Sequence, residues 1–217
     1  MKLQVALDLT NLDTAVDLAR RLYGGGLIDV IEVGTPLIKA YGMYAVSRMR
    51  VCCPSALVFA DLKTMDAGRI EVRLASENGA NMASVLAAAP VDTIREFSDE
   101  ARKLGLSTVV DFIGVINVED RVKEVLNAAK VDYIGLHVGI DVQDSRKVTA
   151  EVLIDEVESI KRKYNVGVTL AGGVDARTAL KLRGRDIDII VVGRAITTAE
   201  KPEDAAREIR RNLGLMQ

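Results

Sequence analysis

The sequence predicts an α/β protein with the architecture of a (β/α)8 TIM barrel, built as a single domain over residues 1–217. Eight short apolar runs recur along the chain, and longer stretches with helical periodicity follow them. Polar residues or glycines stand where most of the runs end. Eight strand–helix units in 217 residues fit a compact barrel, and no linker or low-complexity segment indicates a second domain.

The apolar runs are rich in Val, Ile and Leu, as expected for strands that are covered on both faces. They are Leu3–Leu7, Asp29–Val33, Leu57–Ala60, Asn81–Leu86, Ser107–Phe112, Tyr133–His137, Val166–Leu170 and Asp188–Val192. Amphipathic helices are predicted at Leu12–Tyr23, Asp92–Leu104, Val118–Ala129, Ala150–Tyr164, Asp175–Leu182 and Pro202–Leu213. Pro202 suits the first turn of the last helix, and Gly214 follows its end. A doubly wound open sheet is the alternative, but no G-x-G-x-x-G follows the first run.

Composition argues against several classes of partner. The chain has 29 Lys and Arg against 31 Asp and Glu, so no basic excess indicates binding to nucleic acid or to an anionic membrane. No apolar run approaches the ~20 residues of a transmembrane helix. The N-terminus reaches Asp8 too soon for a signal peptide, and the two cysteines, Cys52 and Cys53, are adjacent and predicted to be reduced packing thiols. We therefore expect a cytoplasmic protein.

Charged residues follow the third run with the spacing D-x-K-x-x-D, as Asp61, Lys63 and Asp66. Asp61 and Lys63 are two residues apart, so on an extended backbone both point to one face. A structural ion pair that caps the strand is the alternative to a functional role. In a barrel, active-site groups lie where the strands end. The residues at those positions are Asp8, Glu32, Asp61, Lys63, Asp111, His137, Gly172, Gly173, Gly193 and Arg194.

The last two strand ends predict a phosphate site. Gly172 and Gly173 permit close approach of a ligand to backbone N–H groups, and Gly193 supplies further donors. Arg194 adds a guanidinium suited to phosphate. In this fold, the loops after strands seven and eight often bind phosphate.

The second and third strand ends predict a metal site. Glu32 is an acid inside an apolar strand, and Asp61 ends the neighbouring one, so the two carboxylates are candidates to share a Mg²⁺ ion. An ion pair between Glu32 and Lys63 is the alternative. His137, the single histidine, is a candidate general acid–base, with packing as its alternative. Asp141 and Gln143 follow closely enough to orient a ring or a ligand.

Asp8 and Lys63 are candidate partners for substrate hydroxyl groups. Asp111 is compatible either with the site itself or with support from behind it.

Over nearly its whole length the chain resembles the 3-hexulose-6-phosphate synthases of the orotidine monophosphate decarboxylase suprafamily. The matching segments are Ala6–Asp8, Glu32–Lys39, Ala60–Gly68, Asp111–Gly114, His137–Gln143, Ala171–Gly173 and Val192–Thr197. The resemblance implies a barrel of the ribulose-phosphate-binding type. It also implies an aldol reaction that joins formaldehyde to D-ribulose 5-phosphate through an enediolate, with Mg²⁺ or Mn²⁺ as cofactor.

The same resemblance implies residue roles. The metal would bind Glu32 and Asp61, His137 would transfer the proton, Lys63 would stabilise oxyanions and Asp8 would orient hydroxyls. A homodimer is implied too, in which Asp66 reaches into the partner's site.

The alternatives are three related enzyme activities and a barrel without catalytic activity. Orotidine monophosphate decarboxylases carry a lysine at the position of Glu32, and ribulose-phosphate 3-epimerases use more than one histidine. 3-Keto-L-gulonate 6-phosphate decarboxylase shares the acids but places an arginine soon after the histidine, whereas the nearest one here is Arg146. A barrel that binds a sugar phosphate without turnover is the fourth possibility.

Overall fold

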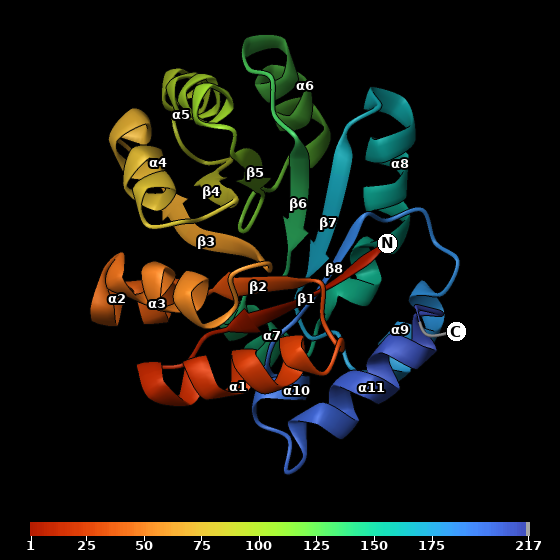
Figure 1. Ribbon diagram of the computed structural model, residues 1–217. Helices are drawn as coiled ribbons and strands as arrows, with labels where there is room; N and C mark the ends of the chain where they lie inside the picture. The colour runs from red at the N-terminus through yellow and green to blue at the C-terminus, as the bar shows by residue number, and fades with distance from the viewer. Residues whose placement is uncertain (216–217) are drawn as a thin grey trace.

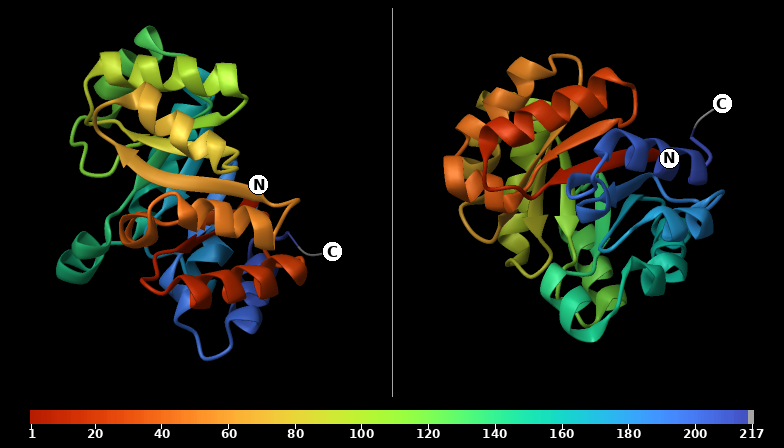
Figure 2. Two further views of the ribbon diagram at one scale, coloured as in Figure 1. Left: turned by 60° about the vertical axis from the view of Figure 1, so that its left-hand side comes forward. Right: turned by 90° about the horizontal axis from the view of Figure 1, so that it is seen from below.

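The computed structural model describes residues 1–215 and shows a closed barrel of eight parallel strands in sequence order, with the helices around the outside (Figures 1 and 2). The strands are β1 Lys2–Leu7, β2 Val30–Val33, β3 Leu57–Thr64, β4 Met82–Leu86, β5 Ser107–Asp111, β6 Tyr133–His137, β7 Gly167–Ala171 and β8 Ile189–Val192. The barrel prediction is confirmed, and all strand bounds except the end of β3 agree to within one residue.

The helices include the six predicted ones, with small shifts at their ends. These are α1 Leu12–Gly24, α5 Val91–Leu104, α6 Val118–Ala128, α8 Ile154–Tyr164, α9 Ala176–Leu182 and α11 Pro202–Asn212. The predicted helix 150–164 begins with a separate 3-10 turn, η1 Ala150–Leu153. Five helices had no predicted bounds, namely α2 Thr35–Tyr41, α3 Tyr44–Cys52, α4 Gly68–Glu77, α7 Ile140–Arg146 and α10 Arg194–Thr197.

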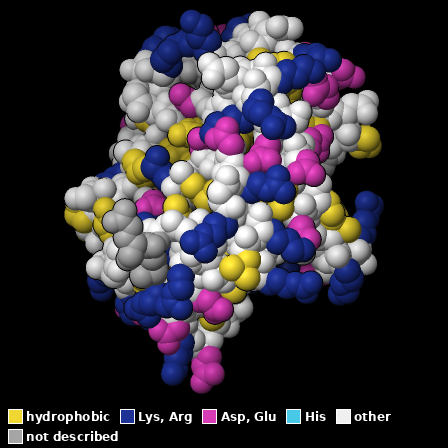
Figure 3. Space-filling view, turned by 90° about the vertical axis from the view of Figure 1, so that its right-hand side faces the viewer, with side chains coloured by type: hydrophobic (Ala, Val, Ile, Leu, Met, Phe, Trp, Pro, Cys, Tyr) yellow, Lys and Arg dark blue, Asp and Glu magenta, His cyan; other side chains and the backbone are white. Residues whose placement is uncertain are grey.

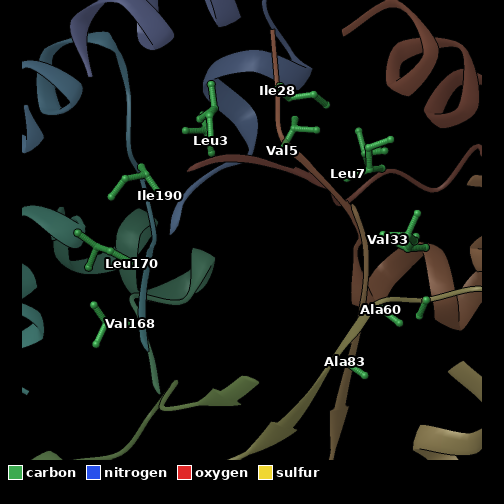
Figure 4. Close-up of a cluster of buried hydrophobic side chains, with 14 of the residues drawn as sticks. Leu3, Val5, Leu7, Ile28, Val33, Ala60, Ala83, Val168, Leu170 and Ile190 are labelled. Carbon is green, nitrogen blue, oxygen red and sulfur yellow. The ribbon is translucent and has the colours of Figure 1, made fainter. Parts of the chain in front are cut away.

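Side chains on the strands alternate between two cores, because successive residues of a strand point to opposite faces. Val, Leu and Ile side chains point outward and pack under the helices, as Leu3, Val5, Leu7, Leu170 and Ile190 do in Figure 4. The inward positions form a separate cluster made of Ala6, Val30, Phe59, Met82, Val109, Ile189 and Val191. The same alternation places the next inward residues at the carboxyl ends of the strands, and these are polar.

Acid or amide side chains fix the opposite end of the barrel. Asp29, Asn81, Asp132 and Asp188 stand directly before β2, β4, β6 and β8. Each accepts a hydrogen bond of 2.8–2.9 Å from a backbone N–H of the preceding odd-numbered strand. Three of these residues were predicted as the first residues of strands. Their backbone N–H groups also donate to the same strand, as Asp29 does to Leu3 at 2.8 Å, so each predicted strand start lies only one residue before the observed one.

Strand β3 continues four residues beyond its predicted end at Ala60. Its pairing with β4 shifts register between Ala60 and Thr64, and Lys63 has a left-handed backbone with φ of 48°. Asp61 and Lys63 therefore belong to the strand and not to the loop after it. The irregular backbone still leaves both side chains on one side, since their charged groups are 2.9 Å apart.

Both sequence signals of the last helix are confirmed. Pro202 is in the first turn of α11, and Gly214 has a φ of 78° just beyond its end. Basic and acidic side chains are interspersed on the face shown in Figure 3, in keeping with the net charge of −2. Within residues 1–215, no helix is long and apolar enough to cross a membrane.

Candidate active site

A cavity of about 590 Å³ opens at the carboxyl ends of the strands. The ten strand-end residues named from the sequence line it, and they come from four strands, from the turns after β1, β7 and β8, and from the start of α10. These ten are Asp8, Glu32, Asp61, Lys63, Asp111, His137, Gly172, Gly173, Gly193 and Arg194. Their convergence follows from the inward positions of a parallel barrel, which all open onto one end.

Two of these acids are buried side by side on β2 and β3. Glu32 is 6% exposed, and its Oε2 accepts a hydrogen bond from Gln4 Nε2 on β1 at 2.5 Å. Asp61 accepts hydrogen bonds from Thr35 and Ser84 at 2.8 and 2.7 Å. Each carboxylate is thus held by neutral donors from adjacent strands or from the start of α2.

The acids of this region repel one another. Burial raises the pKa of Glu32 well above its ordinary value, and the charges of Asp61 and Asp8 raise it further. The pKa of Asp8 is also raised, first by loss of surrounding water and then by Asp61. Carboxylates that destabilise one another's charge form a set of hard oxygen donors that a divalent cation would stabilise.

The donor set fits a magnesium-type ion. Within residues 1–215, no group of three or more His, Cys, Asp or Glu side chains is placed to hold a metal by itself. Mg²⁺ is commonly bound by one or two carboxylates, with water and substrate oxygens as its other ligands. The pair Glu32 and Asp61 meets that requirement. The alternative ion pair between Glu32 and Lys63 is not formed, because Lys63 contacts Asp61 and Asp111 instead.

Lys63 links this acid pair to the histidine. Its Nζ lies 2.9 Å from Asp61 Oδ2 and 2.7 Å from Asp111 Oδ2. Burial disfavours the charge of Lys63, but the two carboxylates outweigh this and raise its pKa. The ammonium group therefore remains protonated at neutral pH, which makes it a fixed positive charge instead of a base.

Asp111 is buried behind Lys63 and His137. Its Oδ2 lies 3.3 Å from His137 Nδ1, and its Oδ1 accepts a hydrogen bond from the Ile113 N–H at 2.9 Å. Burial opposes ionisation of Asp111, but the hydrogen bond with His137 and the charge of Lys63 lower its pKa overall. Asp111 is therefore an anion that faces the cavity and orients both side chains.

The other end of the cavity is formed by glycine turns after β7 and β8. Gly172 and Gly173 have φ values of 114° and 69°, which favour glycine. A Cβ on Gly172 would lie 2.5 Å from the carbonyl oxygen of Val138, so this turn has no room for a side chain. Arg194 begins α10 at the same end, and its guanidinium is paired with Asp144 of α7.

Two predicted residues do not line the cavity. Asp66 is exposed in the loop after β3, where its Oδ1 accepts a hydrogen bond from the Ala67 N–H. Asp141 is exposed in the first turn of α7, while Gln143 of that helix does line the cavity. Because residues 140–146 are helical, Asp141 and Gln143 point in different directions.

Sequence reasoning missed several supporting residues. Gln4 and Ser84 are polar residues in apolar strands at inward positions, and this period-two signal was available in the sequence. Thr35 follows the second strand and binds Asp61. Gly34 was also missed, although a Cβ there would lie 2.1 Å from Asp8 Oδ1. Gly34 and Asp8 belong to two different loops, so no local sequence pattern predicts this contact.

The fold defines a (β/α)8 TIM barrel with its polar cavity at the carboxyl ends of the strands, and comparison with known proteins identifies its family. Residues 1–209 match the orotidine 5'-phosphate decarboxylase / HUMPS family, and the chain belongs to that family. The resemblance inferred from the motifs is thereby confirmed.

Among its relatives, 3-hexulose-6-phosphate synthase of Bacillus subtilis (strain 168) is 38% identical over 208 residues, which are 95% of this chain and 96% of that protein. The crystal structure of 3-hexulose-6-phosphate synthase from Salmonella typhimurium is 32% identical and has a TM-score of 0.91, with 98% of each chain covered. That of 3-keto-L-gulonate-6-phosphate decarboxylase from Vibrio cholerae is 28% identical and has a TM-score of 0.84, covering 98% of this chain and 97% of that one.

Proposed function

We propose that this protein catalyses the Mg²⁺-dependent aldol condensation of formaldehyde with D-ribulose 5-phosphate to 3-hexulose 6-phosphate, and the reverse cleavage. The observation that carries this proposal is one cavity in which Glu32, Asp61, Lys63 and His137 meet opposite a glycine-rich turn. The 38% identity to a 3-hexulose-6-phosphate synthase over nearly the full length of both chains supports the same substrates.

Glu32 and Asp61 would hold the metal ion. When bound, Mg²⁺ or Mn²⁺ would supply a Lewis acid that polarises the substrate carbonyl. Gln4, Thr35 and Ser84 keep the two carboxylates in place through neutral hydrogen bonds. Because these donors come from neighbouring strands, the two acids are positioned before any ligand arrives.

His137 would remove the proton from C1 of the sugar phosphate. Asp111 accepts the hydrogen of Nδ1 in the tautomer that its negative charge favours. That tautomer leaves the lone pair on Nε2, which is the nitrogen that would act as the base. The resulting enediolate carbon attacks the carbon of formaldehyde, and a C–C bond forms as the formaldehyde oxygen takes up a proton.

Lys63 and Asp8 would bind the oxygens of the reacting centre. The ammonium of Lys63 is fixed between two carboxylates, so it offers positive charge to a developing oxyanion without having to move. Asp8 stands at the end of β1 and would orient substrate hydroxyls. Gly172, Gly173, Gly193 and Arg194 would hold the phosphate at the opposite end of the cavity.

Decarboxylation of 3-keto-L-gulonate 6-phosphate is the second candidate, favoured by the 28% identity to such an enzyme. The loop after β6 distinguishes the two. Arg146 is the first arginine after His137, stands at the end of α7, and does not line the cavity. The cavity wall near His137 therefore lacks the guanidinium expected for the decarboxylase.

We also propose a homodimer with composite sites. Asp66 lies outside the cavity of its own chain, in a loop with the half-exposed Met65. Ile70 and Ile116 are exposed by 63% and 93%, and a hollow is lined by Met65, Ala87–Val91 and Val115 together with the polar residues Asn117, Asp120, Arg121 and Glu124. Covering these apolar side chains with a second copy would stabilise the pair and bring Asp66 to the partner's cavity.

Formaldehyde consumption tests the proposal. Purified protein would be mixed with ribulose 5-phosphate and formaldehyde, with Mg²⁺ and then with EDTA. We expect rapid loss of formaldehyde that requires both substrates and stops with EDTA. Exchange of the C1 proton without formaldehyde loss would indicate the decarboxylase, whereas neither reaction would indicate a barrel that only binds.

A further inference from the structure

The guanidinium of Arg194 is already occupied by side chains of α7. Its two terminal nitrogens donate to the two carboxylate oxygens of Asp144 at 3.0 and 3.2 Å. One of them also donates to Gln143 Oε1 at 3.2 Å. This two-pronged geometry is the one in which a guanidinium binds carboxylate or phosphate. A phosphate group that reached Arg194 would thus meet a competing anion.

The rest of α7 is weakly attached to the barrel. None of its residues is buried, and Ile140 and Val142 are 50% and 37% exposed. The left view of Figure 2 shows this teal helix projecting from the body of the molecule. Of the ion pairs within residues 1–215, a single one involves α7, and it is the pair with Arg194. This pair therefore connects the helix to the phosphate end of the cavity.

Asp144 is suited to be displaced. Its hydrogen bond with Arg194 lowers its pKa, so it carries its negative charge at neutral pH. Both partners are about half exposed, at 49% and 60%, and exposed pairs of this kind are weak. A phosphate monoester carries more negative charge than a carboxylate and offers more acceptor oxygens. Phosphate can therefore replace Asp144 at a small cost.

We propose that Asp144 is a built-in competitor that holds Arg194 in the empty site, so that arrival of the substrate phosphate releases both Asp144 and α7. This inference rests on the proposed phosphate site at Gly172, Gly173, Gly193 and Arg194. Asp144 weakens phosphate binding by a fixed factor and thereby speeds release of the phosphorylated product. Asp144 also holds α7 in place, and this helix contributes Gln143 to the cavity wall.

Titration of the full-length protein with inorganic phosphate tests this role. Asp144→Asn and Asp144→Ala both remove the exposed carboxylate that competes with phosphate for Arg194. Both variants should therefore bind phosphate about two- to fivefold more tightly than the unmodified chain. Glu151→Gln is the matched control, because it removes one negative charge from the segment after α7 and its partner is Lys181, not Arg194. Its phosphate affinity should be unchanged.

Hydrogen exchange provides a second measurement. Phosphate should increase amide exchange in residues 140–146 of the unmodified chain, whereas both Asp144 variants should exchange rapidly before phosphate is added. Equal or weaker phosphate binding in the Asp144 variants would overturn the inference and leave the phosphate site intact. If the unmodified chain binds no phosphate and Arg194→Ala behaves in the same way, the proposed phosphate site itself fails, and the inference with it.

Discussion

At the scale of single residues, the site combines one fixed cation with several acids whose environments differ. Lys63 is bracketed by Asp61 and Asp111, which keep it protonated. Asp111 is kept ionised by its basic neighbours, whereas burial, together with the charges of Asp61 and Asp8, raises the pKa of Glu32. The cavity therefore holds one acid with a lowered pKa and one with a raised pKa. Asp111 is suited to orient a base, and Glu32 is suited to the proposed binding of a cation.

Substitution of Glu32 or Asp61, the proposed metal ligands, should abolish turnover. Glu32→Gln and Asp61→Asn keep side-chain shape but remove the charge that would bind the cation, so kcat should fall by at least about a hundredfold. Titration with Mn²⁺, followed by its electron spin resonance signal, should show weaker binding in both variants. Full activity, or unchanged Mn²⁺ affinity, would exclude these acids as the metal ligands.

Removal of the imidazole should stop proton transfer. His137→Asn should slow exchange of the C1 proton of ribulose 5-phosphate with deuterated solvent by about a hundredfold or more, which is the usual contribution of a general base. Asp111→Asn should slow it less, since the imidazole remains but loses its orienting anion. Unchanged exchange in His137→Asn would assign the base to another residue.

At the scale of elements, the two ends of each strand have different tasks. The carboxyl ends and the turns after them hold the polar residues of the cavity, whereas Asp29, Asn81, Asp132 and Asp188 bond to backbone N–H groups at the other end. In barrels of this kind, the first end carries activity and the second carries stability. Substitutions at the two ends should separate the two properties.

Substitution of Gly34, at the start of α2, should affect activity more than stability. A Cβ at this position would lie 2.1 Å from Asp8 Oδ1 and 2.9 Å from the carbonyl oxygen of Leu7, so Gly34→Ala should displace the Asp8 carboxylate and shift the backbone slightly. A shift of about 1 Å in a positioning group can lower kcat/KM by up to a hundredfold. Circular dichroism and Tm would show whether the fold is intact. Normal kcat/KM in Gly34→Ala would mean that the position of Asp8 does not matter for turnover.

Asp132, before β6, should affect stability alone. Asp132→Ala removes the acceptor for the Thr108 N–H and should lower the free energy of unfolding by about 1 kcal/mol. For a chain of this size, that is a fall in Tm of about 2–4 °C. Thermal unfolding and steady-state kinetics of the same sample would check both parts. A large loss of kcat with unchanged Tm would contradict this division of tasks.

At the scale of the whole molecule, the proposed homodimer would cover the exposed apolar side chains beside β3, β4 and β5. Asp66 lies beside this surface and away from its own cavity. Its proposed role therefore depends on assembly and can be tested by mixing inactive chains.

Mixing Asp66→Ala with Lys63→Ala should restore activity if the sites are composite. A mixed dimer would contain one intact site, built from Lys63 of one chain and Asp66 of the other. After full exchange half of the dimers are mixed, so about a quarter of the normal activity should return. Mixing either variant with itself is the control. No recovery, with mixed dimers confirmed by mass, would contradict the composite site and mean that Asp66 does not act in the partner's cavity.

The sequence by itself determined the barrel, because eight Val-, Ile- and Leu-rich runs separated by helical segments indicate strands covered on both faces. The positions of Asp8, Glu32, Asp61 and His137 at the ends of these runs predicted that they meet at one end of the barrel, where the structure finds them. Only the tertiary structure decided which charges pair. Lys63 contacts Asp111, 48 residues away, and Arg194 contacts Asp144, 50 residues away.

Two local features were also decided by the tertiary structure. The left-handed backbone of Lys63 accompanies the shift of register between β3 and β4, and Asp144 in the helix over residues 140–146 pairs with Arg194, 50 residues away. Periodicity reports which face of an element is buried, and it carries no information about which partner meets a side chain across a closed barrel. For this reason the sequence located the site, and the fold alone defined its electrostatics.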